Sequence, residues 1–121
     1  MGDEKKRILV VDDELPILAS IQIMLEDANY EVITASVGED VEHLRWQARP
    51  DLILLDMLLA GTDGREIIKQ MKSRKETSDI PIILLSAHPS GESEADIYGA
   101  DDFLAKPFEM DELLSIIAKH V

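Results

Sequence analysis

The sequence contains no cysteine, and this absence excludes disulfide bonds, thiolate metal sites and cysteine nucleophiles. A chain without cysteine is also what a reducing cytoplasm favours. No run approaches the roughly 18 consecutive apolar residues of a membrane-spanning helix. The first residues, MGDEKKR, lack the apolar core of a signal peptide. We therefore expect a cytoplasmic protein that has no membrane partner.

Basic residues are scarce, because 12 lysines and arginines stand against 25 acidic residues and give a net charge of −13. Nucleic acids and anionic membranes would repel such a chain, so direct binding to either is disfavoured. An excess of acid is compatible with binding a cation, but acidic surfaces are usually only solvated. The charge therefore disfavours two classes of partner without identifying one.

Apolar residues make up 45% of the 121 residues, and this length suits one compact domain, which we expect to span residues 1–121. Short runs rich in Ile, Leu and Val predict five strands. These runs are residues 7–11, 31–35, 51–55, 80–86 and 102–105. Four of the five lack polar alternation, which is typical of strands buried on both faces of a sheet.

Segments with a helical spacing of apolar residues lie between these runs, at 16–28, 37–49, 64–72 and 110–121. The first carries an apolar stripe formed by Ile17, Ile21, Leu25 and Ala28. A fourth helix, between Ser86 and Gly99, is expected to be short or irregular because Pro89 and Gly91 interrupt it. The alternation of strand and helix predicts an α/β fold with a parallel sheet and helices on both faces.

Acidic residues follow two of the predicted strands. The run ILVVDDE ends in Asp12, Asp13 and Glu14, and LILLD ends in Asp56. Ligands of an open parallel sheet bind at the carboxyl ends of its strands, so these carboxylates should share one edge. Asp12 or Asp13 alone could be a helix cap, but no helix begins after Asp56. Oxygen ligands without His or Cys favour Mg²⁺, which leaves room for a phosphate.

Two further strand ends supply groups that bind phosphoryl oxygens. Ser86 ends the run IILLSA with a hydroxyl group, and Lys106 follows the last strand with a compact cation. Singly, such residues are more often a turn serine and a solvated lysine. Together with the acids after strands one and three, they predict one site for phosphate and metal.

Over essentially its whole length, the sequence resembles the receiver domain of two-component response regulators. The matching motifs are VVDDE (10–14), LLD (54–56), DG (63–64), LLSA (84–87), GADDF (99–103) and KPF (106–108). They occur in the order of that family and nearly with its spacing. The resemblance implies a single doubly wound, flavodoxin-like domain whose five-stranded parallel sheet has the order 2-1-3-4-5. It also implies a cis peptide bond before Pro107.

The resemblance further implies how the site would work. Asp56 matches the aspartate that accepts a phosphoryl group from a partner histidine kinase or histidine phosphotransfer protein. Asp12, Asp13 and Asp56, with the backbone carbonyl of Met57, would hold Mg²⁺. Because a carboxylate nucleophile needs no general base, the absence of histidine from these motifs is no objection. The chain would catalyse its own phosphorylation and dephosphorylation without being a metabolic enzyme.

The same resemblance assigns residues to phosphate binding and switching. Ser86 and Lys106 would each bind a phosphoryl oxygen. Ser86 would move toward the phosphate and Phe103 would turn inward, which would change the surface read by a downstream protein. We expect Phe103 to lie inward even without phosphate, because its ring has no hydroxyl to hold it at the surface. Leu58 and His88 would flank the phosphate.

Two other functions are weighed against this one. A degenerate receiver would keep the fold as an interaction module without being phosphorylated. A haloacid-dehalogenase-type phosphohydrolase would need a second aspartate where this chain has Leu58. The chain could be free-standing or excised from a larger regulator or hybrid kinase. The three histidines, His43, His88 and His120, share no metal-ligand spacing and are expected at the surface.

Overall fold

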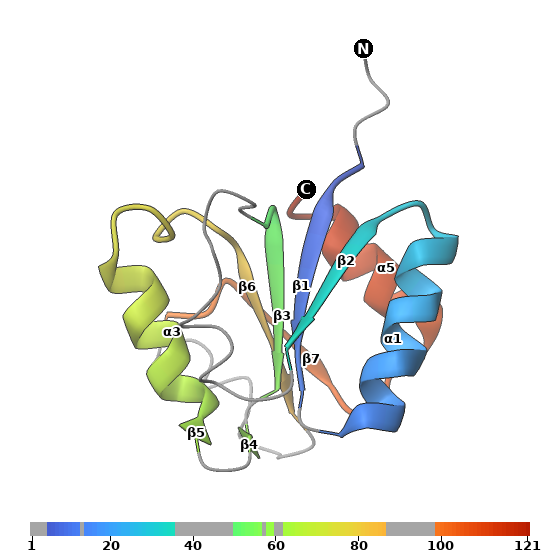
Figure 1. Cartoon of the computed structure of the whole chain (residues 1–121), viewed down its shortest axis with the longest axis horizontal. Helices are drawn as coiled ribbons and strands as arrows, with labels where there is room; N and C mark the ends of the chain where they lie inside the picture. The colour runs from blue at the N-terminus through green and yellow to red at the C-terminus, as the bar shows by residue number, and fades with distance from the viewer. Residues whose placement is uncertain (1–4, 13, 36–49, 57, 60–61, 87–98) are drawn as a thin grey trace.

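The computed structural model describes residues 5–12, 14–35, 50–56, 58–59, 62–86 and 99–121. Its main sheet consists of β1 (Arg7–Val11), β2 (Glu31–Ala35), β3 (Leu52–Asp56), β6 (Ile82–Ser86) and β7 (Asp102–Ala105), all paired in parallel. The strand order β2-β1-β3-β6-β7 is the predicted order 2-1-3-4-5 (Figure 1). The predicted α/β fold is therefore confirmed.

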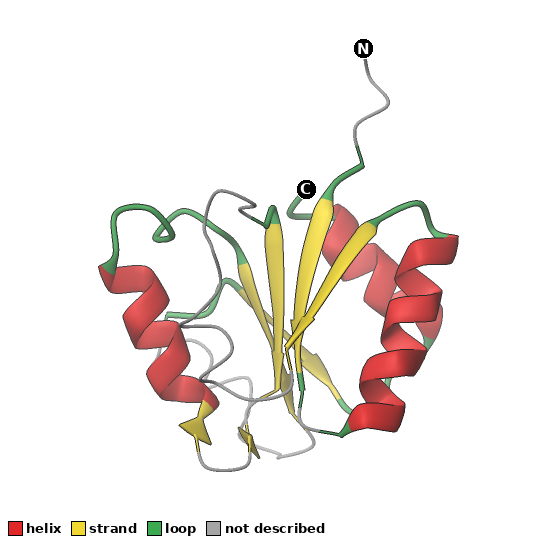
Figure 2. Ribbon diagram, viewed as in Figure 1, coloured by secondary structure: helices red, strands yellow, loops and turns green. Residues whose placement is uncertain are grey.

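Helices cover both faces of this sheet (Figure 2). The helices α1 (Leu15–Asp27) and α5 (Met110–Ala118) lie on one face, and α3 (Gly64–Ser73) lies on the other (Figure 1). The predicted helix 37–49 and the predicted irregular fourth helix lie outside the described residues. Within the described part of the chain, no helix combines the length and the apolar character that crossing a membrane requires.

Alternation along the strands divides the core into two clusters. In β3, Leu52 and Leu54 pack with α1 and α5, while Ile53 and Leu55 pack with α3. Each of these four side chains is at most 1% exposed, so β3 is buried on both faces. Such burial explains why the strand reads as a continuous apolar run rather than as an alternating one.

The structure corrects the apolar stripe that was predicted for α1. The buried residues of this helix are Leu18, Ile21 and Leu25. Ile17 and Ala28 are only partly buried, because the sheet lies closest to the side of the helix on which Leu18 stands. The helix ends where Asn29 adopts a left-handed conformation with φ of 73°, and the N–H of Tyr30 then donates to the carbonyl of Leu25.

A short antiparallel pair of strands follows β3. It joins β4 (Leu58–Leu59) to β5 (Thr62–Asp63), and α3 begins directly after it. This pair was not predicted, because two residues are too few to show a periodicity. It lies near the carboxyl ends of the main strands (Figure 1).

Candidate functional site

Two buried carboxylates meet at the carboxyl edge of the main sheet. Val11 pairs with Leu55 in the parallel register of β1 and β3, so Asp12 follows one strand beside Asp56 at the end of the other. Asp12 is 0% exposed and Asp56 is 7% exposed. Each position has the same parity as the strand residues that face α1 and α5, so the two side chains leave the sheet on one side.

Lys106 reaches both of these carboxylates from the end of β7. Its Nζ lies 3.2 Å from Oδ1 of Asp56 and 3.4 Å from Oδ2 of Asp12. The backbone supports this position, because the N–H of Lys106 donates to the carbonyl of Ser86 at 2.9 Å. The peptide bond between Lys106 and Pro107 is cis, as predicted.

The charges of these groups depend on one another. Burial alone would lower the pKa of Lys106, but the negative charges of Asp56 and Asp12 outweigh burial and raise this pKa above its ordinary value. Lys106 is therefore a permanent cation across the physiological range. One cation facing two carboxylates leaves an excess of negative charge that a further cation would offset.

Asp12 is held in place by the start of α1. Its Oδ1 accepts the N–H of Glu14, the residue before the first turn of the helix, at 2.9 Å. Its own N–H donates to the carbonyl of Ala35 at 3.1 Å. The bond to Glu14 lies before the helix, because Glu14 is the N-cap residue of α1 and no side chain caps the helix there. The helix-cap alternative is therefore not confirmed for Asp12, whose second carboxylate oxygen faces Lys106.

Ser86 and Phe103 lie on the other side of the sheet. Ser86 shares the parity of Ile82 and Leu84, which pack with α3, and it is 3% exposed. Phe103 is partly buried and packs against the same apolar cluster. The register pairs Leu84 with Phe103 and Ser86 with Ala105, so the two proposed switch residues lie on neighbouring strands and one face.

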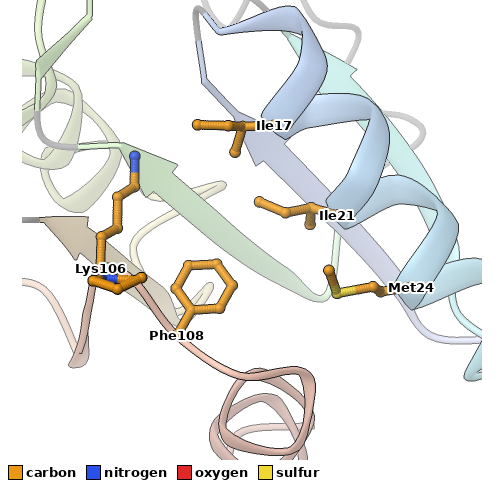
Figure 3. Close-up of a pocket in the computed structure, with 6 residues that line it drawn as sticks. Ile17, Ile21, Met24, Lys106 and Phe108 are labelled. Carbon is orange, nitrogen blue, oxygen red and sulfur yellow. The ribbon is translucent and has the colours of Figure 1, made fainter.

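The aliphatic part of Lys106 borders a separate apolar cavity of about 380 Å³. Its other lining residues are Ile17, Ile21, Met24, Pro107 and Phe108. In Figure 3 the three α1 side chains point across the cavity toward Phe108, and the Lys106 nitrogen points away from it. The side chain therefore has an apolar environment along its stem and an ionic one at its tip.

The described part of the site supplies oxygen ligands of the kind that Mg²⁺ binds. Asp12 and Asp56 supply carboxylate oxygens on one edge, which is the chemistry that Mg²⁺ selects. Asp13 and Met57, the other predicted ligands, lie outside the described residues, as does His88. No group of three acidic, histidine or cysteine ligands occurs among the residues that the structure describes. The two described carboxylates fit a Mg²⁺ site that would be completed by neighbours and water.

The pair of His120 and Asp102 could not be predicted from the sequence. His120, which was expected at the surface, has a side chain that is 21% exposed, and its Nε2 lies 2.9 Å from Oδ2 of Asp102. The two residues are 18 positions apart and belong to different elements, so no local pattern could reveal the pair. His43 and His88 lie outside the described residues.

Known proteins resemble this chain along most of its length. Residues 8–118 match the family model of the response regulator receiver domain. The phosphate regulon transcriptional regulatory protein PhoB of Pseudomonas aeruginosa is 43% identical over 114 residues, which cover 91% of this chain and 49% of that protein. The chain spans about half the length of the curated relatives that it matches first.

Solved structures show the same likeness. Chemotaxis protein CheY4 of Vibrio cholerae is 29% identical with a TM-score of 0.90, and the match covers 98% of this chain and 100% of that one. The response regulator TrrA of Thermotoga maritima, in complex with Mg²⁺ and BeF, is 34% identical with a TM-score of 0.86. That match covers 96% of this chain and 99% of that one.

Proposed function

Because the chain belongs to the family of response regulator receiver domains, we propose that Asp56 accepts a phosphoryl group from a partner histidine kinase or histidine phosphotransfer protein. The observation that carries this proposal is the contact of Lys106 Nζ with both Asp56 and Asp12. A cation and two carboxylates at the open edge of a parallel sheet suit the binding and transfer of a phosphoryl group.

The transfer itself requires few groups. An oxygen of the Asp56 carboxylate attacks phosphorus in line with the P–N bond of the donor phosphohistidine. A bond from this oxygen to phosphorus forms as the P–N bond breaks, and the imidazole leaves with the electron pair and takes a proton from solvent. No general base is needed, because a carboxylate nucleophile has no proton to remove. Positioning and charge neutralisation provide most of the rate.

The other residues of the site would bind the transferred group. Lys106 bridges Asp12 and Asp56, and its Nζ would bind one equatorial oxygen of the phosphoryl group. The Ser86 hydroxyl would bind another. Mg²⁺, held by Asp12, Asp13, Asp56 and the backbone carbonyl of Met57, would neutralise further charge on the phosphoryl oxygens. The complex of TrrA with Mg²⁺ and BeF supports a magnesium-dependent reaction in this chain.

The output would be a changed surface rather than a chemical product. Movement of Ser86 toward the phosphate would open space that the Phe103 ring fills on the α3 face. A downstream protein would read this surface. The net charge of this domain is −13, which repels nucleic acids and anionic membranes. We therefore propose that the domain itself contacts neither of them directly. We also propose that it acts in the cytoplasm.

The test is intact-mass spectrometry after incubation with acetyl phosphate and Mg²⁺. The wild type should gain the mass of one phosphoryl group, and Asp56→Asn should gain none. Asp51→Asn is the matched control, because Asp51 directly precedes β3, is exposed, and lies at the opposite edge of the sheet. This control should be labelled like the wild type. A wild type that gains no mass would contradict the proposal and favour an interaction module that is not phosphorylated.

A further inference from the structure

His120 connects the end of α5 to the beginning of β7. The helix α5 ends at Ala118, and the backbone N–H of His120 still donates to the carbonyl of Ile117 at 2.9 Å. Its Nε2 lies 2.9 Å from Oδ2 of Asp102, the first residue of β7. An ionised carboxylate can only accept, so Nε2–H is the donor in this bond.

The second carboxylate oxygen of Asp102 forms a hydrogen bond within β7, the strand that begins at this residue. Oδ1 of Asp102 accepts the backbone N–H of Phe103 at 2.9 Å. Because the N–H of Lys106 donates to β6 and N–H groups alternate in direction along a strand, the N–H of Phe103 points to the open edge of the sheet. The Asp102 carboxylate therefore joins the end of α5 to the backbone of Phe103.

We propose that Asp102 and His120 form a proton-dependent latch, which holds the C-terminal end of α5 against the strand that carries Phe103. The latch is strongest when the imidazole is protonated and the carboxylate is ionised. Histidine changes its charge between about pH 5 and 8, and a free aspartate does so near pH 4. The pair carries both charges only while the imidazole holds its second proton.

The surroundings of Asp102 favour its ionised form. Burial alone would raise the pKa of Asp102, but the hydrogen bonds from His120 and Phe103 and the charge of Lys119 outweigh burial and lower it. The lowered pKa keeps the carboxylate ionised in mild acid, and its contribution to stability is lost only when the pH falls through that lowered value. Among the described residues, the charged group nearest to the pair is Lys119, whose Nζ lies 3.5 Å from Asp102 Oδ2.

On the neighbouring strand, the described residue beside Asp102 carries no charge. The residue of β6 that pairs with Asp102 is the apolar Ile83. The side chains of His120 and Asp102 are 21% and 25% exposed, which leaves the pair accessible to protons but less screened than a fully exposed one.

A functional consequence follows, and it rests on the proposed function. If Phe103 responds to phosphorylation of Asp56, a closed latch would restrain the strand through which that response passes. Mild acid would then oppose the switched surface, and neutral or basic solution would release it. The latch itself is a property of the unphosphorylated chain.

The latch can be tested by a double-mutant cycle with Asp102→Asn and His120→Gln, which keep the size and the hydrogen-bonding oxygens or nitrogens of each residue but remove the charge. Urea unfolding of all four chains at pH 5.5 and at pH 8 measures the coupling between the two positions. We expect coupling of roughly threefold to tenfold in the folding equilibrium constant at pH 5.5 and below about twofold at pH 8.

Two controls accompany the cycle. Glu31→Gln removes a carboxylate charge on β2, at the opposite edge of the sheet from β7, and should show no coupling to His120→Gln at either pH. Hydrogen exchange of the Phe103 amide should become faster in His120→Gln than in the wild type at pH 5.5, and the difference should shrink at pH 8. Equal coupling at both pH values, or none at pH 5.5, would overturn the latch. No phosphodonor is used, so a failure to phosphorylate Asp56 would leave this result unaffected.

Discussion

Two features of the environment of Lys106 have opposite effects on the charge of its amine. Its stem borders an apolar cavity, and its nitrogen reaches two carboxylates of the opposite charge. Desolvation would favour the neutral amine, but Asp56 and Asp12 keep it charged. A lysine arranged in this way is fixed at both ends, so it can meet an incoming phosphoryl group with little reorganisation.

The role of Lys106 predicts the effect of removing its charge. Lys106→Gln should slow the labelling of Asp56 by acetyl phosphate by about tenfold to a hundredfold, because a charge-assisted hydrogen bond to the phosphoryl group is lost. The rate of mass gain under fixed Mg²⁺ measures this effect. The control is Lys72→Gln, because Lys72 also pairs with an aspartate, Asp101, at 2.7 Å but at the amino-terminal edge of the sheet. Equal slowing by both substitutions would show that Lys106 acts only through stability.

At the scale of elements, the sequence contains most of the information that places the strands. Runs such as 51–55 predict β3 to within one residue, because burial on both faces leaves no place for polar residues. The meeting of Asp12, Asp56 and Lys106 also follows from the strands, since parallel carboxyl ends share an edge. The roles of these residues in phosphoryl transfer stay predictions.

Other features could not be predicted, for physical reasons. The helical period predicts the width of an apolar stripe but not its centre. For this reason the sequence pattern places Ile17 in the stripe of α1, whereas Leu18 is the residue that is buried. The pair of Asp102 and His120 forms only after α5 has packed beside β7, and no local rule describes such a contact. The two-residue strands β4 and β5 are too short to carry a pattern.

The packing of α3 gives a prediction at this scale. Ile68 is 0% exposed in the cluster between α3 and the sheet, whereas Ile23 in α1 is 61% exposed. Ile68→Ala should lower the free energy of unfolding by about 2–5 kcal/mol through lost burial and a new cavity. Ile23→Ala should change it by about 0.5 kcal/mol or less. Urea unfolding of both variants is the measurement. Similar losses for the two would mean that the assigned burial of α3 is wrong.

At the scale of the whole molecule, 25 acidic residues against 12 basic ones make general repulsion part of its stability. Any salt should screen this repulsion, so a general effect of salt must be separated from specific binding of Mg²⁺. The separation is possible because the two effects depend on different residues. Screening involves the whole surface, and binding would involve the carboxylates at one edge of the sheet.

Binding of Mg²⁺ should therefore stabilise the fold beyond what salt does. At equal ionic strength, Mg²⁺ at about ten times its dissociation constant should raise the free energy of unfolding by about 1.4 kcal/mol relative to NaCl. Asp12→Asn should abolish this difference, since its amide still accepts the Glu14 N–H but carries no charge. Asp51→Asn should retain it. A wild type with identical stability in the two salts would contradict the proposed magnesium site.

The alternation of side chains in β3 limits how the length of this chain can change. Asp56 faces the site because it stands an even number of positions from Leu52 and Leu54. If a single residue were inserted within β3, each strand residue after the insertion would move to the opposite face of the sheet. Asp56 would then lie on the face of Ser86, although the composition of the run would hardly change. The turn at Asn29 and Tyr30 lies at the other edge, where extra residues would leave this register intact. Insertions at the amino-terminal edge are thus compatible with the proposed phosphorylation of Asp56, and insertions inside the central strand are not.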